Sequence, residues 1–570
     1  MPRNYIWIAC CLLLSTASHS QDRQGKPDLP GMILCVARDT RDLDRLYPVK
    51  YVPGYLDRMQ TYYDTQEKAL RSLPFKSITR SDQVDYLLLQ REIRHAQHEL
   101  REQQELFTSI KSLLPFEEQV MVLVNERQRG NNLDAVTAAE QFNSIGKSAK
   151  ELLETADLSH LNIPATQYLS KVLYALQAGL DYVYNFYNGY DPQFSWWCKA
   201  PYAAAKESLN NYRQRVQKQE ATLRESLVTD ASGIKGTPVG KAALEELLTY
   251  EMIPYSPEEL VTIANKEFAW CDAQMLKASR EMGYGNDWKK ALEAVKQHYV
   301  PPGQQPALIH RLADEAIRYV DSADLVTVPA MAKELWRMNM LTAEQQRFAP
   351  FFLGGESILI AYPTDEMDHD TKMMSLRSNN YAFSHATVFH ELIPGHNLQG
   401  FMNARYKSYR GMFRTPFSVE GWALYWEMLL WDKGFHATPE EKIGALFWRM
   451  HRCARIIFSL NYHLGKWTPS QCIDFLVDRV GHEKHSATSE VRRSFEGNYG
   501  PLYQIAYMMG GLQLRSLYRE VVEGGKMTAK QFHDAYLHEN AIPNELFRAT
   551  VIDVPLNPDY KTNWRFADLD

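Results

Sequence analysis

The residues with the clearest chemical potential lie between 383 and 400, in FSHATVFHELIPGHNLQG. Within this stretch His390 and Glu391 are adjacent, and His396 follows. Neutral imidazoles bind Zn²⁺, and a glutamate that leaves the metal free can act as a base toward water. The motif therefore predicts a zinc site in which His390 and His396 bind the metal and Glu391 activates water.

The spacing of the two histidines requires a break in the helix that carries them. In the common H-E-x-x-H pattern the histidines lie four residues apart and share one helix face. His390 and His396 lie six residues apart, so a regular helix would turn the second roughly 120° away from the first. Pro394 and Gly395 lie between them and favour a break with a tight turn. The alternative is a helix that simply ends there, beside two unrelated histidines.

A third metal ligand is expected from residues 418–431, SVEGWALYWEMLLW. The segment predicts a helix that is capped by Ser418 and is apolar on nearly all sides, and therefore buried. A buried carboxylate must pair with a cation or bind a metal. Glu420 is the predicted ligand, because the chain after His396 is long enough for a helix, a loop and a returning helix. Glu427 is expected either to orient a ligand histidine or to pair with an arginine.

Two further segments offer groups that can stabilise a developing negative charge. Residues 500–515, GPLYQIAYMMGGLQLR, predict a helix with Tyr503 and Tyr507 on one face. One of these phenols can stabilise an oxyanion. His463 lies in an apolar helical segment and is a second candidate for an active-site role. For each of these side chains, packing in the core is the alternative, and we name Tyr507 and His463 as the catalytic candidates.

The elements that must position these residues are mostly helices. Apolar residues recur at intervals of three and four through much of residues 48–323, and residues 82–110 predict a long amphipathic helix. The pattern changes near residue 324. DLVTV (324–328) and ESILIAY (356–362) predict short strands. A strand beside the metal site could bind an extended peptide by edge pairing.

Composition excludes several classes of protein. The 570 residues are 45% hydrophobic and 23% charged, which suits a globular enzyme with a large core. A net charge of −6 gives no basic surface for nucleic acid, so no nucleic-acid partner is expected. The seven cysteines form no C-x-x-C pair. They therefore indicate neither a disulfide scaffold nor a cysteine zinc site, and at most one or two bridges are expected.

Residues 1–20 predict a signal peptide. They combine an early basic residue with an apolar run at 5–14 and small residues at the end. The run of about ten residues is too short to span a bilayer, and no later apolar stretch reaches the roughly 18 residues required. We therefore expect an exported protein, periplasmic or secreted, without a transmembrane segment. A lipoprotein is the alternative, but Cys10 and Cys11 lie within the apolar run instead of just after it.

Several motifs together resemble a bacterial family catalogued as domain of unknown function 885. They are HELIPGHNLQ (390–399), EGWALYWE (420–427), the R-x-x-R stretch that leads to His463 and Trp467, EVRR (490–493), and the segment from Tyr507 to Gly510 before Leu514 and Arg515. The resemblance covers about residues 350–520. Members look like helical zinc metallopeptidases of the gluzincin type. The resemblance implies one Zn²⁺ per chain, held by His390, His396 and Glu420, with Glu391 as the base.

The chain departs from the family pattern at two places. Many members have a second histidine directly after the residue that matches His396, whereas this chain has Asn397. If that second histidine were the ligand, the site would be impaired here. GPLYQ also replaces the usual Pro-Gly-Gln-Ala before Tyr507, so the oxyanion role of this tyrosine does not transfer directly.

These observations predict a mostly α, large helical, zincin-like metallopeptidase with a few short β-strands next to the metal site. We expect a signal peptide at 1–20, an N-terminal helical region at 21–323 and a C-terminal metal-binding catalytic region at 324–570. The expected reaction is zinc-dependent hydrolysis of a peptide substrate, in which the metal polarises the carbonyl and lowers the pKa of water toward about 7. A catalytically silent peptide-binding protein and a zinc hydrolase of non-peptide amides or esters are the alternatives. Exopeptidase and endopeptidase action are both compatible with the motif, and the sequence predicts no oligomeric state.

Overall fold

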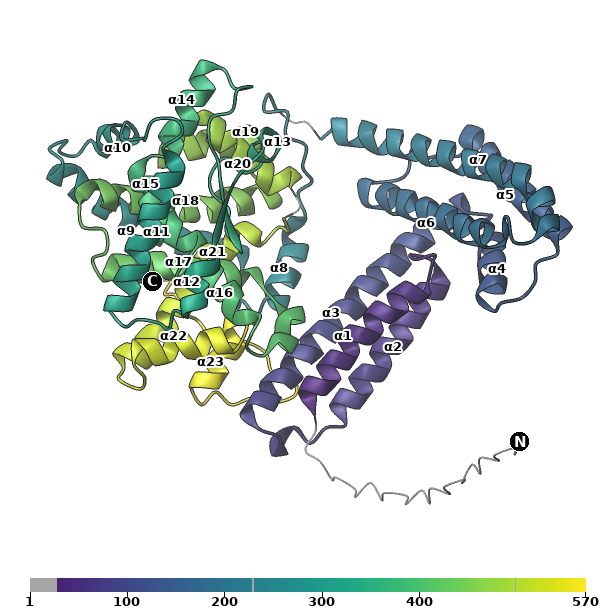
Figure 1. Ribbon diagram of the computed structural model, residues 1–570, viewed down its shortest axis with the longest axis horizontal. Helices are drawn as coiled ribbons and strands as arrows, with labels where there is room; N and C mark the ends of the chain where they lie inside the picture. Colours follow the sequence, from purple (N-terminus) through teal and green to yellow (C-terminus); the bar gives the residue numbers. More distant parts are fainter. Residues whose placement is uncertain (1–27, 228–229, 498, 570) are drawn as a thin grey trace, which may run out of the picture.

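The computed structural model describes residues 28–227, 230–497 and 499–569 (Figure 1). The predicted signal peptide at 1–20 lies outside these residues, so export stays a prediction. Across the described ranges, no helix has both the length and the apolar character needed to cross a membrane. The five described cysteines, which are Cys35, Cys198, Cys271, Cys453 and Cys472, are free thiols.

The structure is mostly helical, as predicted. The helices of the first part of the chain are α1 (Leu29–Leu46), α2 (Pro53–Arg71), α3 (Arg80–Ile110), α4 (Glu117–Gln128), α5 (Ala135–Thr155), α6 (Ile163–Tyr187), α7 (Pro192–Glu225), α8 (Gly240–Tyr250), α9 (Pro257–Glu281), α10 (Trp288–Lys296) and α11 (Gln305–Ser322). The predicted helix at 82–110 is confirmed as α3. It begins two residues earlier, because Thr79 and Asp82 form a capping box there.

The second part of the chain contains shorter helices and one small sheet. Its elements are α12 (Ala330–Leu335), β1 (Arg337–Met340), α13 (Ala343–Gln346), β2 (Ser357–Ile360), α14 (His369–Ser378), α15 (Tyr381–Glu391), α16 (His396–Asn403), α17 (Pro416–Asp432), α18 (Pro439–His463), α19 (Pro469–Phe475), α20 (Lys484–Glu496), α21 (Tyr503–Tyr518), α22 (Ala529–His538) and α23 (Asn544–Val551).

The helices pack around two main hydrophobic cores. Helices α4 to α7 share one core and extend as an arm from the rest of the molecule (Figure 1). The larger core joins α1 to α3 with the elements from α8 to the C-terminus. Val320 and Leu325, on either side of the proposed boundary at residue 323, both belong to this larger core. The domain division at that residue stays a prediction.

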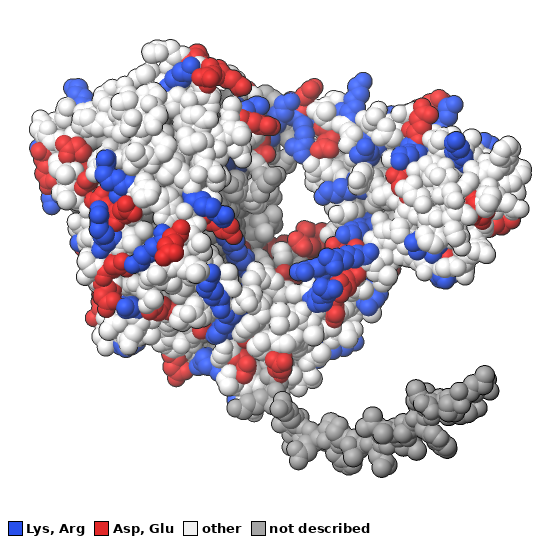
Figure 2. All heavy atoms as spheres, in the orientation of Figure 1, with Lys and Arg blue, Asp and Glu red and all other residues white. Residues whose placement is uncertain are grey.

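The outer surface carries mixed charge. Figure 2 shows acidic and basic side chains interspersed over the visible face, with an open space between the arm and the main body. Neither the arm nor the main body shows a surface of a single charge on this face.

The two strands form a small parallel sheet beside the predicted site. Met338 of β1 lies opposite Ile358 of β2, so the predicted strand at 356–362 is confirmed. The predicted strand at 324–328 is wrong, because these residues form a turn and an irregular segment. Their backbone bonds to side chains of α22 instead of to a strand: Thr327 N donates to an oxygen of Asp534. The apolar residues of this segment enter the core without a pairing partner.

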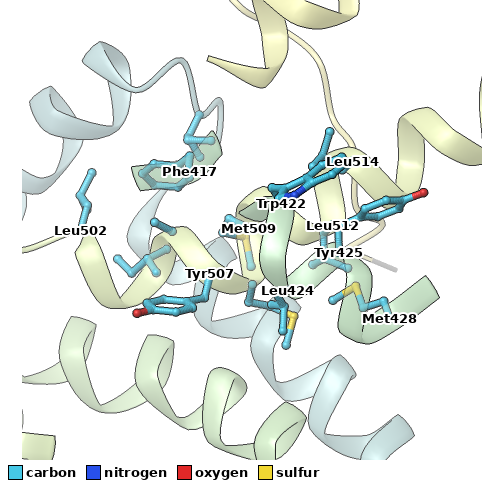
Figure 3. Packing of buried hydrophobic residues seen from close by; sticks show 14 of the residues in the cluster. Phe417, Trp422, Leu424, Tyr425, Met428, Leu502, Tyr507, Met509, Leu512 and Leu514 are labelled. Atoms are coloured by element: carbon cyan, nitrogen blue, oxygen red, sulfur yellow. The ribbon is translucent and has the colours of Figure 1, made fainter. Parts of the chain in front are cut away.

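Helices α17 and α21 cross at the centre of the larger core, where their backbones touch. A Cβ atom on Gly510 would lie 1.9 Å from the carbonyl oxygen of Phe417, and a Cβ on Gly421 would lie 2.6 Å from the backbone of Gly510. Figure 3 shows Phe417, Trp422 and Leu424 of α17 packed beside Tyr507 and Met509 of α21. The crossing brings Glu420 of α17 into contact with Tyr503 of α21.

The burial predicted for the helix at 418–431 is confirmed, whereas its predicted cap is wrong. Thr415, not Ser418, caps α17 by accepting a hydrogen bond from Phe417 N. The helix begins earlier because Pro416 occupies its first turn, where its fixed φ and missing N–H carry no cost.

Candidate metal centre

The chain breaks its helix between the two histidines, as the sequence predicts. Helix α15 ends at Glu391 and α16 begins at His396. The turn between them is tight: Gly395 N donates to Phe389 O at 3.0 Å, and a Cβ on Gly395 would lie 1.9 Å from His390 O. Only glycine fits that approach. The imidazole rings of His390 and His396 consequently meet, with their centroids 4.8 Å apart.

The structure brings the third predicted ligand to the same point. Glu420 Oε2 lies 3.1 Å from His396 Nε2 and 3.9 Å from His390 Nε2. This buried carboxylate oxygen has no hydrogen-bond partner among the described residues. Ligand atoms of His390, Glu391 and His396 also lie within 4.8 Å of one another, as a group that could hold a metal ion. Two imidazole nitrogens and a carboxylate oxygen form a donor set that suits Zn²⁺.

The electrostatics of this group favour a cation. Burial alone would raise the pKa of Glu420, but His396 and His390 outweigh burial and hold that pKa well below its usual range. Burial alone would lower the pKa of His396, but the nearby Glu420 carboxylate has the stronger effect and raises that pKa overall. An ionised, buried carboxylate with one free oxygen therefore faces two imidazoles, which is a favourable place for a divalent ion.

Glu391 lines the same cavity as the two histidines. Burial raises the pKa of its carboxyl group, although His390 and His396 act in the opposite direction. A raised pKa suits a group that takes up and returns a proton near neutral pH. Gly354, in the loop before β2, makes room for the side chain: a Cβ there would lie 2.3 Å from Glu391 Oε2.

Glu427 lies seven residues beyond Glu420 on α17, which is about two helical turns, and it contacts the other ring nitrogen of His390. Its Oε1 atom lies 2.7 Å from His390 Nδ1 and 3.2 Å from Arg452 Nη2. The sequence left two roles open for this residue, orienting a histidine or pairing with an arginine, and the structure contains both contacts. Burial acts to raise the pKa of Glu427, but Arg452 and His390 lower it overall, so the carboxylate stays ionised.

Both candidate tyrosines reach the cavity. Tyr503 donates its O–H to Glu420 Oε1. The Tyr507 ring stacks on His390, with the centroids 6.2 Å apart, and its hydroxyl accepts a hydrogen bond from Arg493 Nη2 at 3.5 Å. Burial raises the pKa of Tyr507 to about 12, so at neutral pH the phenol keeps the proton that it would donate to an oxyanion.

The structure does not bring His463 to the same place. It lies at the end of α18, packed against Tyr462 and Phe495, and is absent from the residues that line the cavity. Neither ring nitrogen has a hydrogen-bond partner among the described residues. Burial lowers the pKa of His463 to about 4. A catalytic role for this residue stays a prediction without a contact to support it.

Asn397, which follows His396 and also lines the cavity, has a structural contact of its own. Asn397 Nδ2 donates to the carbonyl oxygen of Gly355 at 3.0 Å, and this bond ties α16 to the loop before β2. His396 is therefore the residue that presents an imidazole to Glu420.

The cavity around these residues has a volume of about 1350 Å³. Usual small-molecule pockets measure roughly 300–1,000 Å³, so this one has room for a peptide segment. The strand β2 contributes Leu359 to its wall, and the preceding loop contributes Gly354 and Gly355. The predicted proximity of a strand to the site is thus present.

Sequence reasoning missed the role of three cavity arginines, which are Arg452, Arg455 and Arg493. For Arg452 and Arg455 the available signal was the R-x-x-R spacing within an otherwise apolar helix, since residues three apart share one face. Buried arginines on such a face must find negative partners inside the fold. The partners of Arg452 and Arg455 come from α17 and α20, which local sequence patterns do not bring together.

Comparisons with known proteins agree with the helical fold. A family model described as "Bacterial protein of unknown function (DUF885)" matches residues 40–551. No curated protein matches the chain. A solved structure from Shewanella oneidensis, described as a candidate lipoprotein of unknown function, is 14% identical with a TM-score of 0.62, covering 92% of this chain and 98% of that one. A candidate lipoprotein from Colwellia psychrerythraea is 17% identical with a TM-score of 0.58, with the same two coverages.

Proposed function

This chain belongs to the bacterial family of unknown function DUF885, and from the site that it carries we propose that it is a zinc-dependent metallopeptidase. The observation that carries the proposal is the convergence of His390 Nε2, His396 Nε2 and Glu420 Oε2 in the wall of a peptide-sized cavity. Glu391 lies beside the two histidines and forms no ion pair among the described residues, so its carboxylate is available to act on water.

Each residue has a distinct part in the proposed reaction. His390, His396 and Glu420 would hold the cation, which when bound supplies Lewis-acid polarisation of the substrate carbonyl and makes nearby water more acidic. Glu391 takes a proton from water as the water oxygen attacks the carbonyl carbon. It then delivers that proton to the amine nitrogen as the C–N bond breaks. Tyr507 donates its O–H to the oxyanion that forms on the carbonyl oxygen.

Zinc content and chelator sensitivity test this proposal. The purified full chain is expected to bind one Zn²⁺ and to cleave members of a mixed peptide library, with products identified by mass spectrometry. A chelator should abolish cleavage and added Zn²⁺ should restore it. In water enriched in ¹⁸O, each new carboxyl group should gain one heavy oxygen. A chain that binds no zinc on titration would contradict the proposal. Zinc binding without hydrolysis would favour the catalytically silent peptide-binding protein. Cleavage of esters or non-peptide amides, but not of peptides, would favour the zinc hydrolase of those compounds.

We also propose that the protein acts outside the cytoplasm. Residues 1–20 have the pattern of a signal peptide, and the two structural relatives are described as candidate lipoproteins. Peptides of the cell envelope or the medium would then be its substrates. Cell fractionation followed by mass spectrometry should find the chain outside the cytoplasm and shortened near residue 20. A processed N-terminus at Cys10 or Cys11 carrying lipid would establish the lipoprotein form, and a full-length cytoplasmic chain would contradict export.

A further inference from the structure

Three buried arginines line the wall of the cavity beside the candidate metal centre. Arg452, Arg455 and Arg493 are 4%, 2% and 6% exposed, and all three line the cavity. Taking a guanidinium out of water is costly unless a negative group compensates its charge. The question is therefore which of the three guanidinium groups has a carboxylate partner.

Two of the three arginines have a carboxylate partner. Arg452 Nη2 lies 3.2 Å from Glu427 Oε1, and Arg455 Nε donates to Glu490 Oε1 at 2.7 Å. Arg493 forms no ion pair with a carboxylate of the described residues. Within the part of the chain that the structure describes, Arg493 is thus the one of these three arginines without a carboxylate at ion-pair distance, and the nearby Glu490 carboxylate pairs with Arg455.

The contacts of Arg493 leave it free to bind a ligand. Its guanidinium lies 4.6 Å from the centroid of the Tyr499 ring, and Nη2 donates to the Tyr507 hydroxyl at 3.5 Å, which is a long hydrogen bond. Its buried Nε has no hydrogen-bond partner among the described residues. A planar guanidinium with unused N–H groups is the side chain that binds a carboxylate in bidentate fashion.

Arg493 lies close enough to the candidate metal ligands for an anion bound to it to belong to the peptide that is being cut. Tyr507 contacts Arg493 through its hydroxyl and stacks on His390 through its ring. Arg493 is thus separated from the candidate metal ligands by one tyrosine side chain. Successive Cα atoms of a peptide are about 3.8 Å apart, so an anion on Arg493 would lie within one or two residues of the peptide bond being cut.

We propose that Arg493 binds a carboxylate of the substrate, so that the enzyme prefers peptides with a carboxylate one or two residues from the cleaved bond. This proposal rests on the proposed peptidase function and specifies its substrate class. The carboxylate has two possible sources, the C-terminus of a short peptide or the side chain of an acidic residue. A C-terminal carboxylate would make the enzyme an exopeptidase acting near the end of its substrate.

Paired peptides that differ only in one carboxylate test the proposal and separate its two sources. The first pair is trialanine and trialanine amide, which differ at the C-terminus. The second pair is Ala-Glu-Ala-amide and Ala-Gln-Ala-amide, which differ in a side chain. Both kcat/KM and the affinity from titration calorimetry are measured with the zinc-loaded full chain. We expect the carboxylate member of one pair to be favoured about 10- to 100-fold, as for loss of a hydrogen bond to a charged group.

Variants of Arg493 assign the preference to this side chain. Arg493→Gln should lose the 10- to 100-fold preference, so that the ratio of kcat/KM between the carboxylate peptide and its amide falls to about one, mainly through a higher KM for the carboxylate peptide. Arg493→Lys keeps the charge and should retain part of the preference. Arg492→Gln is the matched control, because Arg492 is adjacent on α20, pairs with Glu496 and lies outside the cavity wall. It should retain the full preference, and circular dichroism should show that all three variants fold.

The results also distinguish this proposal from the function on which it rests. Equal kcat/KM and equal affinity for both members of both pairs would overturn the carboxylate site while leaving a peptidase. A preference that survives in Arg493→Gln would overturn the assignment to Arg493. If no peptide is cleaved, the proposed function fails, and calorimetry still decides whether Arg493 selects the carboxylate peptide as a ligand.

Discussion

Glu391→Gln is expected to abolish hydrolysis while leaving the fold and the metal site intact. The glutamine has nearly the same size as the glutamate, so it should still fit against Gly354, whose missing Cβ makes room for this side chain. His390, His396 and Glu420 would keep their mutual contacts. An amide cannot accept and return the proton of the attacking water, and loss of such a group costs about 10²–10⁴ in rate.

Three measurements are needed for this variant: zinc content, thermal unfolding and kcat/KM for a peptide that the native protein cleaves. We expect native zinc content and stability, with at least a 10²-fold loss of kcat/KM. Glu356→Gln is the control. Glu356 also lines the cavity, but it is exposed and pairs with Arg337 instead of facing the ligands, so its replacement should change activity little. A Glu391→Gln protein that holds zinc and cleaves at the native rate would contradict the proposed base. Loss of zinc or of folding would indicate a structural role.

Glu420→Gln is expected to cause the largest loss of zinc affinity of any single change on α17. Glu420 Oε2 is the carboxylate oxygen that faces both imidazole Nε2 atoms. A neutral amide is a poor ligand for Zn²⁺ compared with a carboxylate. Glu427→Gln provides a graded comparison on the same helix, because Glu427 contacts His390 through the opposite ring nitrogen. Removing such a supporting carboxylate costs about 10- to 100-fold in affinity or activity.

Competition titration with a fluorescent zinc chelator would rank the two variants. We expect Glu420→Gln to lose more than the roughly 100-fold upper value for a supporting residue and to remain inactive after zinc is added. Glu427→Gln should recover part of its activity when zinc is in excess. Glu545→Gln is a suitable control for removal of a buried charge, since Glu545 contacts Tyr560 and Thr562 in the C-terminal segment. The reverse ranking of the first two variants would exchange the roles of Glu420 and Glu427.

The sequence alone was enough to predict the local features of the site. The six-residue spacing of His390 and His396 demanded a break in the helix, and Pro394 and Gly395 could supply it because their backbone restrictions act locally. The apolar helix with two glutamates was also predictable, because a carboxylate in an apolar helix must find a cation. Helix α15 ends at Glu391, and α17 is buried with both glutamates inside.

Only the tertiary structure decided which of the candidate side chains meet. The backbone contact between Gly421 and Gly510 sets where α17 and α21 cross, so Tyr503 reaches Glu420. His463 has the same kind of apolar helical surroundings in the sequence, yet it lies outside the cavity. The segment 324–328 has strand composition but bonds to α22. The lack of an ion-pair partner for Arg493 among the described residues also depends on the tertiary structure. The carboxylates that pair with the neighbouring arginines come from α17 and α20, whereas sequence periodicity reports only on neighbours along one helix or strand.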